Sequence, residues 1–229
     1  MKAIYDSPWH HPFVAYLVGV WLLFEIARRL PFLYGYLFVF LVCILADATC
    51  TGGWSPVPMN TPAYTASSVI FIILGDMRYF VLGERVSRLN ESLGRTLRFS
   101  IPISFLVPVT TEIMRQTMPV MQNDRVLYVV YEGAMVFLVL GLSRFRFGPR
   151  AQDPELARYI HRVSLLFATG YFGWAACDVL ILLDVELGHL LRIVPNVMYY
   201  GAFLVLVFVQ APAKLRSLEC MPVAGPGAR

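Results

Sequence analysis

The chain has few charged residues and almost no lysine, and each shortage excludes a class of protein. Charged residues make up 15% of the 229 positions, against about 25% in ordinary soluble domains. This share is too low for a disordered chain, a coiled coil or a typical cytosolic enzyme. The two lysines, Lys2 and Lys214, both fall outside the apolar segments. A retinal pigment, which needs a buried lysine for its Schiff base, is therefore excluded.

Signatures of metal and nucleotide binding are also absent. The four histidines form no HxxxH or HExxH pattern, and the four cysteines form no CxxC pair. We therefore expect no zinc site and no disulfide framework. P-loop, GxGxxG and GxSxG motifs are missing too, so we predict neither a metal nor a cofactor. The basic residues lie in short gaps between apolar runs, which the positive-inside rule explains without a nucleic-acid partner.

Apolar sequence is what the chain has in abundance. Hydrophobic residues make up 58% of it, and the mean hydropathy is +0.62. Because a helix needs about 20 mostly apolar residues to span a bilayer, we predict an all-α integral membrane protein with a seven-transmembrane-helix bundle over residues 1–211. The predicted segments are 13–28, 32–52, 63–83, 99–118, 126–143, 162–183 and 190–210. The first is expected to be an uncleaved anchor, and residues 212–229 a flexible cytoplasmic tail.

The distribution of lysine and arginine predicts the orientation of this bundle. With the N-terminus outside and the C-terminus inside, fourteen of the 19 basic residues lie on the inner side and four on the outer side. Omitting the fourth segment, which holds two prolines and two charged residues, gives nine on each side. Seven crossings are therefore favoured. Asp47 and Asp178 have similar surroundings in the second and sixth segments, which is compatible with a 3+1+3 parallel repeat.

Ionisable residues inside the predicted segments are the candidate functional residues, because a charge at bilayer depth costs about 2.5–3.5 kcal/mol. Asp47, Glu112, Glu132 and Asp178 lie at comparable depth toward the outer side. If they converge, they form an acidic cavity that favours a proton, a cation or an amine. Alternatively, Asp47 and Asp178 accept hydrogen bonds between helices and only hold the bundle together. Glu112 can pair with Arg115, which favours a structural role.

Two further polar residues complete the candidate set. Asp76 lies toward the inner side of the third segment, on a face polar enough to line a pathway. The residues that share this face are Thr65, Ser68, Ile72 and Tyr79. Asn196, near the outer end of the seventh segment, is expected to give polar contacts in the cavity, beside two tyrosines at positions 199 and 200 that close a pocket or form an interfacial belt.

Two charged groups on the third segment are expected to have ordinary roles. Arg78 faces away from Asp76, so we expect it to extend to the inner headgroups or to pair with Glu25. Glu84 and Arg88 are four residues apart, which predicts a solvated ion pair.

The sequence is compatible with three functions. The first is a carrier of a small polar solute or cation, in which Asp47 and Asp178 contact the solute, Glu132 and Asn196 assist, and the face of Asp76 completes the inner path. The second is an intramembrane enzyme acting on a lipid or isoprenoid, with the acids as general acid and base. The third is a sensory or scaffold subunit with structural acids. The lipid bilayer is the predicted environment, and compactness and short loops favour a bacterial cytoplasmic membrane over an organellar one.

Overall fold

The computed structural model describes residues 18–19, 21–22, 33–53, 55–59, 61–89 and 91–217. These residues form helices and no strand. Five helices are long and apolar enough to cross a membrane: Pro62–Ser87, Leu93–Thr117, Asp124–Arg150, Pro154–Leu182 and Leu187–Val209. A shorter apolar helix, α3 (Tyr34–Thr51), precedes them. The chain therefore has the helices of a polytopic membrane protein.

Two of the five long helices contain a π-helical turn. The uninterrupted ones are α4 (Pro62–Ser87), α5 (Leu93–Thr117) and α8 (Pro154–Leu182). A short 3-10 helix, η1 (Pro119–Gln122), follows α5. The next long helix then consists of three parts: α6 (Asp124–Leu142), the π-helix η2 (Ser143–Phe147) and α7 (Gly148–Arg150). The last long helix consists of α9 (Leu187–Leu191), α10 (Ile193–Val197), the π-helix η3 (Met198–Ala202) and α11 (Phe203–Val209). A short helix, α12 (Ala213–Ser217), follows.

The all-helical membrane architecture is confirmed for the described residues. The last six predicted segments overlap α3 and the five long helices. The first, 13–28, falls almost entirely outside the described residues, so the count of seven and the orientation in the membrane remain predictions. Residues 213–217, which we had placed in the flexible tail, form α12, and Leu215 on this helix is buried.

Local sequence explains where several helices begin. Thr61 Oγ1 accepts a hydrogen bond from the Tyr64 N–H (3.2 Å), and a proline follows Thr61 at the first helical position of α4. Asn123 caps α6 in the same way, through the Arg125 N–H (2.9 Å). Asp153 caps α8, through the Glu155 N–H (2.8 Å), again with a proline at the first position. Each cap satisfies a backbone donor that the helix itself leaves unpaired.

The helices turn large apolar side chains outward, as expected for lipid contact. Phe137, Phe145 and Phe172 are among the most exposed residues of the described chain. On α5 the buried face consists of small residues, mainly serine and threonine, and the exposed face is apolar. The buried residues of α5 are Thr96, Ser100, Ser104, Val107 and Thr111. Small and polar residues at helix contacts with apolar residues outside are typical of membrane bundles.

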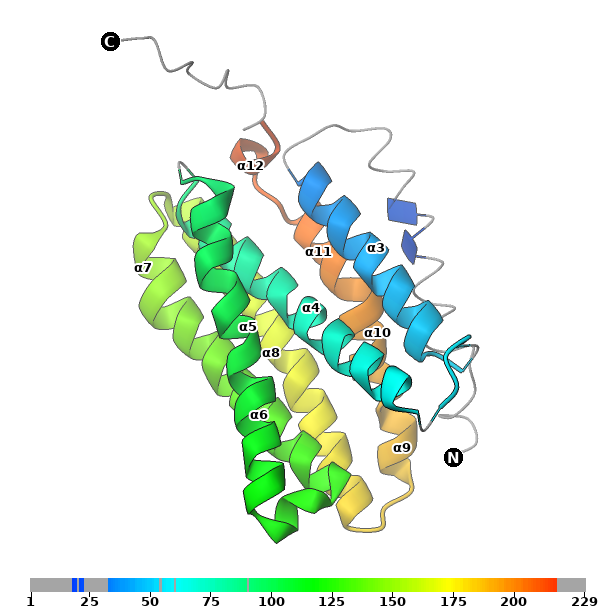
Figure 1. The fold of residues 1–229 in the computed structure, drawn as a ribbon. Coiled ribbons are helices and arrows are strands. Elements are labelled where there is room, and N and C mark those ends of the chain that lie inside the picture. The colour runs from blue at the N-terminus through cyan, green and yellow to red at the C-terminus, as the bar shows by residue number, and fades with distance from the viewer. Residues whose placement is uncertain are drawn as a thin grey trace, which may run out of the picture.

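Figure 1 shows how the long helices alternate in direction. Helix α4 packs between α3 and α5, and α6 packs along α8. The connection from α3 to α4, the start of α6 and α9 lie at one end of the bundle, called the α9 end below (Figure 1). The end of α4, the start of α5, α7 and α12 lie at the opposite end, called the α12 end (Figure 1).

Aromatic side chains fill the middle of the bundle between these two ends. The Tyr79 ring stacks on Phe167, with ring centroids 5.0 Å apart. The Tyr79 hydroxyl lies 3.1 Å from the Val139 carbonyl oxygen and 2.8 Å from Ser164 Oγ. These contacts join α4, α6 and α8 through one fully buried side chain.

Candidate functional site

A cavity with a volume of about 430 Å³ lies at the α9 end, between α3, α4, α6, α8, α10 and η3. Tyr128, which lines it, is 40% exposed, so the cavity reaches the protein surface. Six tyrosines and one tryptophan make up much of its wall. Its charged lining residues are Asp47, Arg125, Glu132 and Arg192.

Asp47 and Glu132 are the two carboxylates in the cavity wall, from α3 and α6. Both side chains are buried. Thr51 Oγ1 donates a hydrogen bond to Asp47 Oδ1 (2.6 Å), and Tyr200 also hydrogen-bonds to Asp47. Glu132 lies within hydrogen-bond contact of the Asp178 carboxyl group, and its Oε2 is buried with no donor group bound to it among the described residues. Two carboxyl groups in contact are stabilised by a proton or a cation between or beside them, so the position of Glu132 favours a ligand that carries positive charge.

Asp178 lies behind this wall, on α8, and two arginines bind it. Its side chain is 0% exposed. Arg125 Nη1 donates to Asp178 Oδ1 (2.8 Å), and Arg192 Nη1 donates to the same oxygen. The second oxygen, Oδ2, is buried with no donor group bound to it in the part of the chain that the structure describes, and the carboxyl group of Glu132 lies in hydrogen-bond contact with the Asp178 side chain. Asp178 is therefore an ion-paired residue next to the cavity rather than one of its lining residues.

A tight turn after α8 brings Arg192 to this position. Asp184 has a φ of 57°, in the left-handed region, and this residue turns the chain back after the helix ends. Gly188 then approaches α8 closely, because an added Cβ there would lie 2.8 Å from the Cys177 carbonyl oxygen. Helix α9 therefore packs directly against the end of α8, and Arg192 follows it.

Asp76 lies under the cavity and is completely buried. The hydroxyl groups of Tyr131 and Tyr171 each donate to one of its two carboxylate oxygens. Both tyrosines line the cavity, as do Ser68 and Ile72 from the predicted polar face of α4. Asp76 itself is separated from the cavity by the two tyrosine rings.

The other two predicted residues have different positions. Asn196 lines the cavity, and its Oδ1 accepts a hydrogen bond from Trp174 Nε1 (2.8 Å). Glu112 is 48% exposed on α5, where Arg115 Nε lies 3.2 Å from its Oε2 and Gln116 Nε2 donates to its Oε1 (3.0 Å). Glu112 follows directly after the buried stripe of α5 and points away from it. The structure thus brings together Asp47, Glu132, Asp178 and Asn196, places Asp76 beneath them and leaves Glu112 outside.

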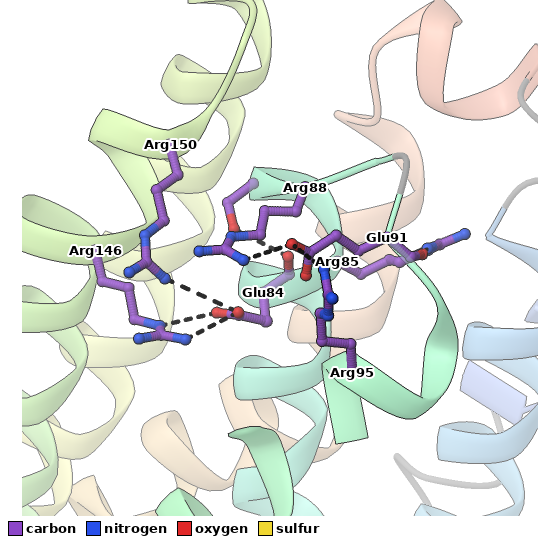
Figure 2. Close-up of polar contacts among 8 residues, drawn as sticks. Glu84, Arg85, Arg88, Glu91, Arg95, Arg146 and Arg150 are labelled. Carbon is purple, nitrogen blue, oxygen red and sulfur yellow. Dashed lines mark hydrogen bonds and ion pairs between the residues drawn. The ribbon is translucent and has the colours of Figure 1, made fainter. Parts of the chain in front are cut away.

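At the α12 end, charged groups of the described residues pair with one another (Figure 2). Glu84 is 3% exposed and accepts hydrogen bonds from Arg146 Nε and Nη2, both at 2.9 Å. Arg150 Nη1 lies 4.0 Å from the same carboxylate. The predicted solvated pair of Glu84 with Arg88 is therefore wrong, because Arg88 binds Glu91 instead. The partners of Glu84 come from η2 and α7, far away in the sequence.

Arg78 also differs from its prediction. Its side chain is 0% exposed, so it does not extend to the headgroups. Its guanidinium carbon lies 3.9 Å from the centroid of the Tyr199 ring and 4.7 Å from that of Phe203. The alternative prediction, a pair with Glu25, falls outside the described residues.

Sequence reasoning missed the two arginines of the cavity. Arg125 lies one residue before the predicted segment 126–143 and Arg192 lies two residues after the start of the predicted segment 190–210, so the charge count assigns both to the adjoining loops. The sequence did indicate that Asp178 needs a basic partner from another helix, because no residue three or four positions away from it can neutralise its charge. Only a few basic residues are predicted on the same side of the membrane, and these two are among them.

Within the described residues, no group of three or more His, Cys, Asp or Glu side chains is arranged to hold a metal ion. No protein-family model, curated protein or solved structure matches the chain. The function is therefore argued from the geometry of the cavity alone.

Proposed function

We propose that the protein is a carrier of a small polar solute that bears a cationic group, and that this solute binds in the cavity at the α9 end. The observation that carries the proposal is the pair of buried carboxylates, Asp47 and Glu132, in the wall of a cavity that reaches the surface. A cation close to a buried carboxylate stabilises its charged form. The neighbouring guanidinium groups of Arg125 and Arg192 donate to Asp178.

The aromatic wall supports the same choice of solute. The faces of tyrosine and tryptophan rings attract cations, most strongly where water is excluded. The cavity volume, about 430 Å³, falls within the range of small-molecule sites, about 300–1,000 Å³. An amine with a short apolar part therefore matches both the charge and the size of the cavity.

The difference between the two ends supports carriage rather than binding alone. A carrier exposes its site to one side of the membrane at a time. In this bundle the cavity reaches the surface at the α9 end, and the ion pairs around Glu84 join α4 to η2 and α7 at the α12 end. We infer an outward-open state in which the inner half is closed.

Uptake into proteoliposomes tests the proposal. Labelled choline and ethanolamine serve as cationic probes, and 3,3-dimethylbutan-1-ol, the uncharged analogue of choline, as the neutral one. We expect uptake of the amines and exclusion of the alcohol. Asp47→Asn and Glu132→Gln should lower the apparent affinity for the amines about 10- to 100-fold, since each removes a charged partner worth about 1.5–3 kcal/mol.

Glu112→Gln is the matched control, because it makes the same chemical change on an exposed residue outside the cavity. It should take up the amines as the wild-type protein does. Equal loss in Glu112→Gln and Glu132→Gln, or unchanged uptake in both Asp47→Asn and Glu132→Gln, would contradict the proposal. Binding of the amines without uptake would contradict carriage and favour the sensory hypothesis.

A further inference from the structure

We propose that Arg78 is an internal binding site for a small anionic group, a carboxylate or a group of similar size, and that Tyr199 is the gate between this site and the cavity. The inference rests on the proposed function and extends it, because it assigns a second charge to the solute. A solute that meets Asp47 and Glu132 with a cation and Arg78 with a carboxylate is a small zwitterion.

The first observation is that the Arg78 guanidinium is buried without an acceptor. The side chain is 0% exposed, and neither Nε, Nη1 nor Nη2 has a hydrogen-bond partner among the described residues. A guanidinium has five N–H donors and stays charged at any physiological pH. A buried charge is normally paired, because the protein interior does not replace its hydration. Among the described residues, Asp47 and Asp76 interact with Arg78 electrostatically, but none accepts a hydrogen bond from its guanidinium group.

The surroundings of Arg78 compensate its charge only in part. Its guanidinium carbon lies 3.9 Å from the ring centroid of Tyr199, 4.7 Å from that of Phe203 and 5.7 Å from that of Phe167. Ring faces attract a cation but accept few of its hydrogen bonds. The nearest acid in the sequence, Asp76, uses its oxygens on two tyrosine hydroxyls.

The second observation is a small void beside Arg78 that shares two lining side chains, Tyr199 and Asp47, with the cavity. The void has a volume of about 10 Å³, and its lining includes Asp47, Gly75, Arg78 and Tyr199. A volume of this size holds about one water molecule. A carboxylate therefore reaches Arg78 only when the Tyr199 ring moves.

The third observation is that the backbone and packing around Tyr199 permit such a movement. Tyr199 lies in the π-helix η3, and π-helical turns within α-helices are frequent at functional sites. A second void of about 10 Å³ lies between α8 and η3, and the Tyr199 ring lines it too. The Tyr199 hydroxyl rests against Gly75, where a Cβ would overlap it. The ring thus borders two voids of one-water size and has a glycine at its tip, while its face lies against the Arg78 guanidinium.

The experiment measures binding to the purified full chain in an uncharged maltoside detergent, with gluconate as the bulky counter-anion. The probes are acetate, choline and glycine betaine, which differs from choline by carrying a carboxylate. We expect acetate to raise the melting temperature and glycine betaine to bind about tenfold more tightly than choline, as one hydrogen-bonded charge pair allows. Arg78→Met should abolish both effects. Arg115→Met, which removes an exposed arginine of α5, should leave both unchanged.

Tyr199→Ala tests the gate separately. Removing the ring should raise the association rate of glycine betaine several-fold, measured by the stopped-flow fluorescence of Trp174, whose ring centroid lies 5.0 Å from that of Tyr199. An unchanged rate would overturn the gate. If acetate does not raise the melting temperature of the wild-type protein, the anion site is overturned. An acetate effect that persists in Arg78→Met overturns it too.

Glu25→Gln distinguishes the remaining explanation, that Glu25 neutralises Arg78. In that case the wild-type protein shows no acetate effect, and Glu25→Gln creates one, which overturns the proposal. The same measurements also show separately whether carriage or the anion site fails. If glycine betaine binds in an Arg78-dependent way but does not enter proteoliposomes, carriage fails and the anion site stands. If the amines are carried and acetate has no effect, the anion site fails and carriage stands.

Discussion

The two ends of the bundle each bury one carboxylate that arginines neutralise, Glu84 at the α12 end and Asp178 at the α9 end, but the α9 end buries two more carboxylates in the wall of a cavity. At the α12 end, Glu84 accepts two hydrogen bonds from Arg146 and has Arg150 nearby (Figure 2). At the α9 end, Glu132 keeps a buried oxygen with no donor group bound to it among the described residues, beside a cavity of about 430 Å³. The difference teaches that ion pairs join helices at both ends, whereas the carboxylates of Asp47 and Glu132, to which no arginine of the described residues binds, line a cavity with room for a ligand.

The same contrast holds for two aromatic rings that pack against glycines of α4. Phe147 of η2 lies against Gly83, and Tyr199 of η3 lies against Gly75. Phe147 is fully buried and has the rings of Tyr79 and Phe99 at centroid distances of 6.0 and 6.1 Å. Tyr199 instead borders two voids and the cavity. One π-helix therefore supplies a fixed core residue and the other a residue with space to move.

The largest expected effect is the loss of the ion pairs at the α12 end. Glu84→Gln leaves the guanidinium groups of Arg146 and Arg150 without their carboxylate; because these groups are 28% and 36% exposed, the cost lies at the lower end of the range of about 3–5 kcal/mol that breaking a fully buried pair costs. We expect the free energy of unfolding to fall by this amount, measured by denaturation in detergent. Glu112→Gln, which breaks a solvent-exposed pair with Arg115, should cost less than about 1 kcal/mol. Equal costs would remove the distinction between the two ends.

An intermediate effect is expected from alanine at the two glycines. Overpacking a well-filled core costs about 1–3 kcal/mol. Gly83→Ala should lie within this range, because Phe147 has no free side to move to between Tyr79 and Phe99. Gly75→Ala should cost less, because Tyr199 can shift into the adjoining voids.

Double-mutant cycles check this interpretation of the glycines. Phe147→Leu should relieve most of the cost of Gly83→Ala, and Tyr199→Ala should relieve that of Gly75→Ala. A larger cost at Gly75 than at Gly83 would show that the Tyr199 ring is fixed, which removes the support for a gate.

The smallest effect is a pH dependence at an exposed pair of the α12 end. The backbone N–H of Glu155, followed by the Lys214 ammonium group, lowers the pKa of Asp153 below its ordinary value. A carboxylate with a lowered pKa in the folded state stabilises the fold above its unfolded pKa of about 3.9, and this contribution is lost as the pH falls through the folded pKa.

Asp153→Asn separates the charge from the helix cap, since asparagine also caps helices. The wild-type protein should melt slightly above Asp153→Asn near pH 6, and the difference should vanish near pH 3. A difference that stays constant over this range would show that the charge of Asp153 contributes nothing.

Much of the helical fold could be predicted because hydropathy is a local property. The predicted segment 63–83 lies within α4, 162–183 overlaps α8 up to its last residue, Leu182, and even 99–118, with its two internal prolines, overlaps α5. The common depth of Asp47, Glu132 and Asp178 followed from the same count of residues along each helix. Hydropathy and depth can both be predicted from the position of a residue in its own segment.

The rest could not be predicted because it depends on how each helix is rotated about its axis. Glu112 lies at the right depth but points outward, since the serine and threonine residues of α5 face the bundle. Glu84 is four residues from Arg88, yet its partners lie on η2 and α7. Arg125 and Arg192 reach Asp178 from two other helical segments.

The sequence by itself determined that the chain forms apolar helices long enough to cross a membrane, roughly where six of them lie, and which acids fall within them. Only the tertiary structure decided which of these acids share a cavity, which arginines neutralise them, and that Arg78 is enclosed by aromatic rings. The reason is that helix formation depends on neighbours within a few residues, whereas charge pairing at bilayer depth depends on side chains that only the packing of separate helices brings together.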